Sequence, residues 1–530
     1  MRRIIIPLIL MSLFLLVSMS GVNASELVVG LGEEPETLDP NKTTRFHSYM
    51  VLSNIIEPLF TLDHSYNVVP LLAESYHWAE DGSKMEVVLK KGIKFHNGSE
   101  MTSSDVKASY ERYFALSPLA NYLPGKKGGI YRIDTPHKYT VVFHFEKAKP
   151  LALYHMADAH VGIMPKAWLA TKSDSEIGIN ELVGTGPLKF VEWVPGDRIV
   201  MERFEQYHHG PNFISNQGPI KAERMIFRVV PEDATMMAEL LVGNVDISFD
   251  VPPNALKILE RNPKIRVETA PTYSVQYLAN NMSSEIMQDK KVRMAIAHAV
   301  NKEEIAKAAW FGVGKKINGL INKATIGYWP GVEEVAYQYD LAQAKSLLEE
   351  AGWQDLNGDG IREKAGKELS LVLITFSNID QWRKAGEIVQ AQLKEVGIKV
   401  DLQTAEVGAT YDRARTGDYD LGIFRNTWWL GQPYLRFLTH SSGIGSSNFG
   451  HWANPTIDQN IEIAGNDMSL EKRTQALNQV QKIVVESAVW VPLVSNANIL
   501  AAKNYVSGLD ELLTHPWWPP LMRALLLEKE

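Results

Sequence analysis

Residues 369–424 read LSLVLITFSNIDQWRKAGEIVQAQLKEVGIKVDLQTAEVGATYDRARTGDYDLGIF. Short apolar runs alternate here with stretches whose apolar residues recur at helical spacing. The pattern predicts strands at 369–376, 398–402 and 419–424, and helices at 380–396 and 407–416. This β-α-β-α-β order favours a sheet with helical crossovers on its faces, and ligands of such sheets gather at the carboxyl ends of the strands.

The chain leaves the last of these strands through a glycine- and serine-rich segment that we expect to be a loop. It holds six large aromatic residues: Trp428, Trp429, Tyr434, Phe437, Phe449 and Trp452. It has no Asp or Glu between Asp420 and Asp458, whereas it does contain Arg425, Arg436, His440 and His451. Large aromatics in a loop at a strand end favour a wall that grips a ligand by its faces. The alternative is that the Trp residues cover an edge of the core.

Length and composition exclude several classes of protein. A chain of 530 residues is too long for one core, so two or three lobes are expected. The formal net charge is −8, and removing Arg2 and Arg3 with a leader gives −8 − 2 = −10. A nucleic-acid partner is therefore not expected, because a phosphate binder needs a basic face. The chain has no cysteine, which excludes disulfides, thiol catalysis, thiolate metal sites and lipid attachment at a cysteine.

The first 24 residues are typical of a secretory signal peptide. Arg2 and Arg3 give a positive start, residues 4–17 are apolar, and Val22-Asn23-Ala24 is a small-residue cleavage site. The apolar run is short for a membrane anchor, which is the alternative interpretation. We therefore expect a mature protein that is free in the periplasm.

Six motifs occur in an order that resembles a known family. They are EEPETLDP at Glu33, NIIEPLF at Asn54, FHNGSEMTSSDV at Phe95, GTGPLKFVEWVPGDRIVMER at Gly184, VRMAIAHAVNKEEI at Val292 and YDLAQAKSLLEEAGW at Tyr339. The chain resembles the extracellular solute-binding proteins of family 5, which serve ABC importers of the peptide/nickel type. The resemblance implies an α/β fold of the two-lobe periplasmic-binding-protein kind, with a hinge and mixed sheets flanked by helices.

Lobe I is expected to comprise residues 25–270 and to regain 495–530, and lobe II to comprise 271–494. Crossovers near 270–280 and 490–497 would form the hinge. The resemblance implies a monomeric receptor that closes on a small or short oligomeric solute and delivers it to an ABC permease in the inner membrane. It would do no chemistry on the solute and need no cofactor or metal. The expected ligand-binding residues are Arg425, Asn426, Trp428, Trp429, Tyr434, Arg436 and Tyr273.

The solute class stays open between oligopeptide, metal chelate and oligosaccharide. The peptide branch of the family usually carries, in the loop matching 427–434, an Asp that pairs with the peptide amine, and TWWLGQPY has no acid. The chain resembles the nickel branch at Thr427-Trp428, at Tyr434 and in DGIREKAGK. That branch has an Arg in the segment matching 155–165, where this chain offers only His155, Met156 and His160 as donors.

Three further patterns have plain interpretations. His208 and His209 are adjacent and would face opposite ways in a strand, so a shared metal is not expected. Residues 355–360 have the oxygen spacing of a calcium loop, but Gly366 stands where the bidentate Glu belongs, which favours a turn. No GxSxG, HExxH or P-loop motif occurs. A secreted hydrolase of sugars or peptides remains the rival function, and a sensor or chaperone on the same fold is a second.

Overall fold

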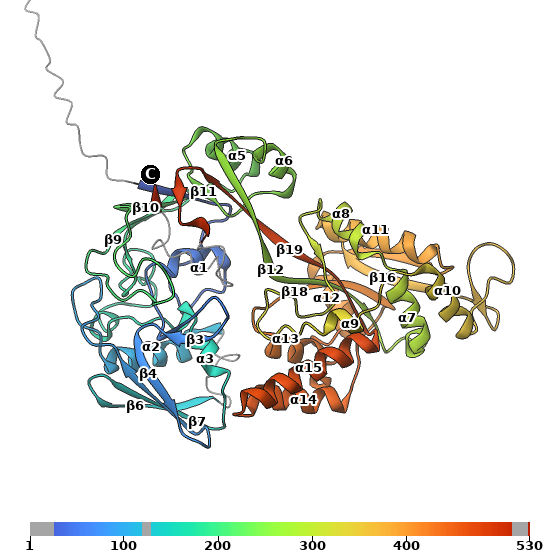
Figure 1. Cartoon of the computed structure of the whole chain (residues 1–530), viewed down its shortest axis with the longest axis horizontal. Coiled ribbons are helices and arrows are strands. Elements are labelled where there is room, and N and C mark those ends of the chain that lie inside the picture. The colour runs from blue at the N-terminus through green and yellow to red at the C-terminus, as the bar shows by residue number, and fades with distance from the viewer. Residues whose placement is uncertain (1–25, 119–128, 511–527, 530) are drawn as a thin grey trace, which may run out of the picture.

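A computed structural model describes residues 26–118, 129–510 and 528–529. The predicted signal peptide lies outside the described residues. Two lobes lie side by side, one built from the blue and teal N-terminal half and the other from the yellow and orange C-terminal half (Figure 1). Two long strands, β12 (Ile265–Asn280) and β19 (Trp490–Lys503), run from one lobe to the other.

The largest sheet has eleven strands and passes through both lobes. Its order is β17-β16-β18-β12-β19-β11-β1-β10-β9-β8, and β13 pairs with β19 beside this path. The other strands of this sheet are β1 (Glu26–Leu31), β8 (Leu188–Val194), β9 (Arg198–Arg203), β10 (Arg224–Val229), β11 (Ile247–Ser248), β13 (Lys315–Lys316), β16 (Ser370–Phe376), β17 (Lys399–Ala405) and β18 (Leu421–Thr427). Because parallel and antiparallel pairs both occur, the sheet is mixed, as the resemblance implied.

Lobe I adds a four-stranded sheet in the order β4-β5-β7-β6 and a hairpin of β2 with β3. These strands are β2 (Phe60–Leu62), β3 (Val68–Pro70), β4 (Ala73–Trp78), β5 (Lys84–Leu89), β6 (Ile130–His137) and β7 (Thr140–Phe145). The helices of this half are α1 (Phe46–Leu52), α2 (Ser103–Leu116), α3 (Ala152–His155), α4 (Lys166–Leu169), α5 (Asp233–Val242) and α6 (Leu256–Leu259). One continuous apolar core joins the β1 sheet to the small sheet.

A buried carboxylate ties this core together. Glu57 accepts hydrogen bonds from the Tyr207 hydroxyl at 2.8 Å and the Thr185 hydroxyl at 3.0 Å, and it pairs with Nε2 of His209 at 2.7 Å. His208 is exposed, contacts the carbonyl of Gln206 at 2.8 Å, and stands edge-on to the ring of His209. The two adjacent histidines therefore face different surroundings, and His209 serves the packing of lobe I.

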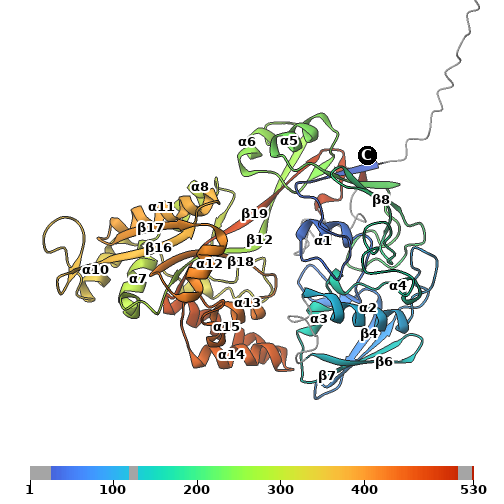
Figure 2. The same ribbon diagram turned by 180° about the vertical axis from the view of Figure 1, so that it is seen from behind.

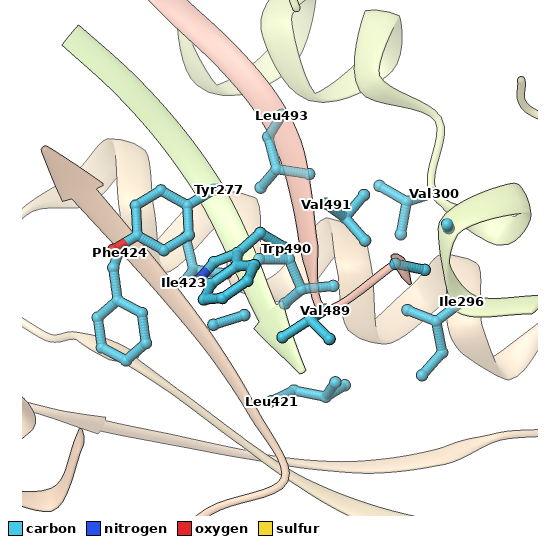
Figure 3. Packing of buried hydrophobic residues seen from close by; sticks show 14 of the residues in the cluster. Tyr277, Ile296, Val300, Leu421, Ile423, Phe424, Val489, Trp490, Val491 and Leu493 are labelled. Carbon is cyan, nitrogen blue, oxygen red and sulfur yellow. The ribbon is translucent and has the colours of Figure 1, made fainter. Parts of the chain in front are cut away.

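Lobe II contains the predicted β-α-β-α-β unit, with β16, β17 and β18 at the three strand positions. Figure 2 shows α11 and α12 around the strands of this unit. The helices of the lobe are α7 (Lys290–Ala299), α8 (Lys302–Ala309), α9 (Val332–Val335), α10 (Leu341–Glu350), α11 (Asp380–Lys394), α12 (Val407–Thr416), α13 (Gly431–Thr439), α14 (Pro455–Asn466) and α15 (Leu470–Ser487). Its core gathers around Trp490, with Ile423, Tyr277 and Phe424 nearby (Figure 3).

The segment after β18 departs from the predicted loop, because it folds into α13. Leu430, Tyr434, Leu435 and Leu438 are all buried, and their spacing is that of one helix face. Pro433 lies in the first turn, where a missing N–H costs no intrahelical hydrogen bond. Gly431 and Pro433, which fall in the stretch predicted as a loop, therefore belong to a helix start.

The two lobe-connecting strands are irregular where the hinge was expected. β12 pairs with β19 in antiparallel register except for shifts between Pro271 and Val275 and between Gln276 and Tyr277. An irregular pairing leaves backbone groups outside the regular ladder and allows the strand to bend. The lobe boundaries at 270 and 494 stay a prediction.

Candidate functional site

The candidate wall on lobe II begins where β18 ends, at the carboxyl edge of the parallel strands. Trp428 turns toward its own lobe and packs on Phe437 of α13, with ring centroids 5.9 Å apart. Trp429 turns the other way, toward lobe I. Neighbouring residues in extended backbone point to opposite sides, so the pair presents one indole to each lobe.

Trp429 belongs to a cluster that joins the two lobes. Its ring lies 6.3 Å from that of Tyr154 and 6.0 Å from that of His155, both in α3. We call this group the inter-lobe cluster; its members are Tyr49, Leu62, Tyr66, Val68, Tyr154, Ala157, Ala159, Ile326 and Trp429. Seven of these come from lobe I and two from lobe II, so the lobes share an apolar contact beside the candidate wall.

Arg425 and Asn426 occupy the last residues of β18. The guanidinium of Arg425 is exposed and lies over the ring of Trp382, 5.1 Å from its centroid. Within the part of the chain that the structure describes, Arg425 makes no ion pair, so its N–H donors remain available to a ligand. Asn426 donates from its side-chain amide to the hydroxyl of Tyr277 at 3.0 Å, which fixes the end of β18 to β12.

The candidate wall on lobe I is organised by Asp158. Its Oδ1 accepts hydrogen bonds from the Tyr49 hydroxyl and the His160 amide, both at 2.9 Å, and contacts Nδ1 of His160 at 2.5 Å. Burial raises the pKa of this carboxyl, but the charge and hydrogen bonds of His160 outweigh burial and hold the pKa below its usual range. The His160 ring also stacks on Tyr49, with centroids 4.7 Å apart.

Two histidine nitrogens on this wall are buried without a hydrogen-bond partner among the described residues: Nδ1 of His155 and Nε2 of His160. Burial lowers the pKa of His155 to about 4, so this imidazole is neutral at pH 7. Met156, the third expected donor, is fully buried in the lobe I core. In the described residues no three His, Asp or Glu side chains are grouped to hold a metal ion by themselves.

Tyr273 lies on β12. Burial raises its pKa well above the usual range, and the neighbouring Tyr66 adds to this effect. Tyr273 in turn contributes to the raised pKa of Tyr49, after burial and Asp158. Tyr49, Tyr66 and Tyr273 therefore lie close together where the hinge strands meet lobe I.

Two of the expected ligand-binding residues lie elsewhere. Tyr434 has no exposed surface and is enclosed in the lobe II core, because the helix α13 turns it inward. Arg436, on the same helix, forms an ion pair with Glu462 of α14. Arg425 and Asn426 thus lie at the end of β18, and Trp429 and Tyr273 lie near residues of lobe I, whereas Tyr434 and Arg436 lie within lobe II. That the first four residues bind a ligand stays a prediction.

His440, His451 and the turn at residues 355–360 support local structure. His440 accepts the amide of Ser442 at the start of a short 3-10 turn, and His451 contacts the carbonyl of Ala414 at 2.8 Å. In residues 355–360, Asp355 accepts the amides of Gly358 and Gly360 at 2.7 and 3.1 Å. These side-chain oxygens shape a turn through bonds to its own backbone. Of the helices that the structure describes, none combines the length and apolarity required to cross a bilayer.

Comparison with known proteins places this arrangement in a family. Residues 67–448 match the sequence model described as "Bacterial extracellular solute-binding proteins, family 5 Middle". The chain belongs to family 5. Both the resemblance seen in the motifs and the predicted two-lobe α/β fold are thereby confirmed. Family 5 proteins are the solute-binding components of ABC importers, which is the function predicted from the motifs.

Three similar proteins illustrate the range of similarity. The oligopeptide-binding protein AppA of Bacillus subtilis is 27% identical over 510 residues, covering 93% of this chain and 91% of AppA. Its structure with a nonapeptide aligns with a TM-score of 0.67 over 95% and 99% of the two chains. The glutathione-binding protein GsiB of Salmonella paratyphi A is 25% identical, covering 92% of each chain. NikA of Brucella suis with Fe(III)-EDTA is 24% identical, with a TM-score of 0.79 over 95% and 100%.

Sequence reasoning missed four residues of the site: Tyr49, Tyr66, Asp158 and Trp382. Trp382 could have been found, because the first turn of a helix that follows a strand lies at the carboxyl edge of the sheet. Tyr49 and Asp158 are 109 residues apart and carry no local signal that they meet.

Proposed function

We propose that this protein captures a small carboxylate-bearing solute between its lobes and passes it, chemically unchanged, to an ABC permease. It acts as a monomer in the periplasm and catalyses no reaction. Arg425, Asn426, Trp429 and Tyr273 contact the solute, and Trp428 backs this surface. The lobe I wall of Tyr49, His155 and His160 completes the enclosure when the lobes close.

The observation that carries the proposal is the state of Arg425. Its guanidinium is exposed at the carboxyl edge of the sheet, lies over the ring of Trp382, and makes no ion pair among the described residues. A planar guanidinium held by stacking offers paired N–H donors that match a carboxylate. No Asp or Glu follows on the chain between 421 and 457 to compete for it.

The relatives are consistent with this chemistry. A nonapeptide, glutathione and EDTA, which appear in the descriptions of AppA, GsiB and NikA, all carry carboxylates. Binding of the amino terminus of a peptide has less support. Asp158 belongs to the lobe I wall, and its Oδ1 is already occupied by Tyr49 and His160. A chelate or an acidic peptide therefore fits better than a neutral oligosaccharide.

Native mass spectrometry of the freshly purified protein tests the proposal. We expect a protein mass increased by one bound solute, and fragmentation should identify carboxylate groups in it. Incubation with a nonapeptide, glutathione and Fe(III)-EDTA should give stoichiometric binding of one of them without a change in its mass. A released product of lower mass would instead support a hydrolase, and binding of only neutral sugars would contradict the carboxylate assignment.

A further inference from the structure

A five-residue loop, Asn322–Ile326, touches three parts of the molecule that move relative to one another when a two-lobe binding protein closes. It contacts the hinge strands β12 and β19, it contacts lobe I, and it pairs with the backbone of the candidate ligand wall. None of these contacts is conspicuous in the sequence.

Asn322 occupies the irregular part of the hinge. Its side-chain amide donates to the carbonyl of Thr272 in β12 at 2.8 Å and to the hydroxyl of Ser495 in β19 at 2.9 Å. This is where the pairing of the two strands shifts register, between Pro271 and Val275. Asn322 thus supplies a donor to a carbonyl in the irregular segment, at a site where the Asn side chain is 96% buried.

The same side chain shapes its own loop. Its Oδ1 accepts the amide of Ala324 at 2.9 Å and the hydroxyl of Thr325 at 3.2 Å. With two donor and two acceptor contacts, the hydrogen-bonding capacity of the amide is used in full. The loop and the hinge strands are therefore held as one unit by a single residue.

Tyr66 connects this unit to lobe I. The Tyr66 hydroxyl donates to the carbonyl of Ala324. Tyr66 has φ of +65°, a left-handed conformation that is unfavourable for a bulky residue. Asp63 holds it there by accepting the amides of Ser65 and Asn67, both at 2.8 Å. A strained backbone that is stabilised from both sides, and that aims one hydroxyl across the lobe boundary, indicates a functional contact.

The loop ends on the candidate ligand wall. The Ile326 amide donates to the carbonyl of Trp429 at 2.9 Å, and the Gly431 amide donates to the carbonyl of Ile326 at 2.9 Å. A Cβ on Gly431 would lie 2.7 Å from that carbonyl oxygen, so the approach requires glycine. A displacement of Trp429 by a solute would therefore move the loop that also holds the hinge.

We propose that the Asn322–Ile326 loop couples solute contact at Trp429 to lobe closure. Asn322 locks the loop to the hinge strands, and the bond from Tyr66 holds lobe I against it. Loss of either bond shifts the lobes toward a separated arrangement. The role of Trp429 as the solute contact rests on the proposed function, whereas the mechanical link from lobe I to the hinge does not.

Distances between spin labels on the two lobes test this link in the protein without added solute. The chain has no cysteine, so cysteines introduced at the exposed positions Glu111 of α2 and Lys384 of α11 can be labelled uniquely. We expect Tyr66→Phe and Asn322→Ala each to raise the ratio of separated to closed lobes roughly three- to tenfold, the effect of one lost hydrogen bond. Amide hydrogen exchange at Ile326 and Gly431 should accelerate in Asn322→Ala by a similar factor.

Two matched variants control for nonspecific effects. Tyr131→Phe removes a hydroxyl from an exposed tyrosine of β6, and Asn448→Ala removes a buried lobe II amide that donates to the carbonyl of Trp452 at 2.9 Å. Both should leave the inter-label distances unchanged. A distance distribution of Tyr66→Phe that coincides with the parent, together with unaltered exchange in Asn322→Ala, overturns the coupling. Because no solute is present, that result leaves the proposed function untouched.

Discussion

The ring of Trp429 in lobe II stands edge-on to the ring of His155 in lobe I, with centroids 6.0 Å apart and planes at 77°. Adjacent Trp428 instead packs on Phe437 within its own lobe. The two indoles therefore have different structural roles. Trp429 joins the two lobes, while Trp428 packs within lobe II.

We expect Trp428→Ala to weaken binding of the solute at least tenfold, or about 1.4 kcal/mol. The indole packs on Phe437 behind the candidate wall, and alanine removes that support. Isothermal titration calorimetry with whichever of a nonapeptide, glutathione or Fe(III)-EDTA binds will measure the change. Tyr131→Ala, at an exposed aromatic of β6, serves as control. Equal affinities of Trp428→Ala and the parent would remove this residue from the site.

Arg425→Gln should weaken binding of a carboxylate ligand by about 1.5–3 kcal/mol, which is the range for a hydrogen bond to a charged group. The affinity that remains should also depend less on salt concentration, because one charge pair is gone. The matched control is Arg415→Gln, whose guanidinium pairs with Asp412 on the surface of α12 at 2.6 Å. Calorimetry at two salt concentrations separates the variants, and parallel behaviour of both would argue against Arg425 as the ligand's partner.

Gly431→Ala should destabilise lobe II, because the new methyl would lie 2.4 Å from Cδ1 of Ile321 and 2.7 Å from the Ile326 carbonyl. We expect a loss of about 1–3 kcal/mol, typical of overpacking. Gly408→Ala in α12 is the control, since its Cβ would have no neighbour within 4 Å. That change should stabilise the helix by about 0.5–1 kcal/mol. Urea unfolding followed by circular dichroism gives both numbers, and the prediction requires opposite signs.

Glu57→Gln should lower the free energy of unfolding by about 3 kcal/mol, because it leaves the buried His209 without its carboxylate. Glu111→Gln is the matched control, because Glu111 is exposed and lies 3.9 Å from Lys107 on α2. It should change the free energy of unfolding by less than about 0.5 kcal/mol. Urea midpoints at pH 7 will compare the two. Similar small losses in both would show that the Glu57–His209 pair adds nothing to lobe I.

His96 should make the protein less stable in acid. Burial lowers its pKa to about 4, although its hydrogen bond to the Gly186 carbonyl opposes this effect. Because the folded-state pKa lies below the ordinary value of 6.5, the stabilisation is complete above pH 6.5. It is lost as the pH falls toward 4, by up to about 3 kcal/mol. A proton on Nδ1 would face the Gly184 amide, which donates to that nitrogen at 3.3 Å.

His96→Gln removes this proton-binding site and should flatten the fall in stability between pH 6.5 and 4. Urea unfolding at several pH values measures the slope. His208→Gln, at an exposed histidine next to the buried His209, should leave the slope as it is. A slope that is the same in both variants would assign the acid sensitivity to other groups.

The fold of lobe II could be predicted because its signals are local. The helix 407–416 has the bounds of α12, and the strands 369–376, 398–402 and 419–424 match β16, β17 and β18 within three residues at each end. The start of α13 was misinterpreted because the glycine and serine content of the whole segment was taken as the sign of a loop, although residues 431–439 form a helix. The expectation that Tyr434 contacts a ligand followed from that one error.

The wall of lobe I could not be predicted, because it depends on contacts between distant segments. Tyr49 meets Asp158, and Tyr66 meets Ala324 across 258 positions. Aromatic residues are common in cores and at sites alike, so their type alone does not separate the two roles. The candidates at the end of β18 came from the rule that ligands gather at strand ends, which is a property of topology.

β12 hydrogen-bonds to β18 of lobe II along one edge and to β19 along the other, and β19 continues to β11 of lobe I. If one lobe unfolded alone, these strands would lose their hydrogen-bonded neighbours, and unpaired peptide groups would be exposed along their edges. The ladder therefore penalises half-unfolded species. Thermal denaturation should accordingly proceed as one cooperative transition, with a calorimetric enthalpy equal to the van't Hoff value for the whole chain.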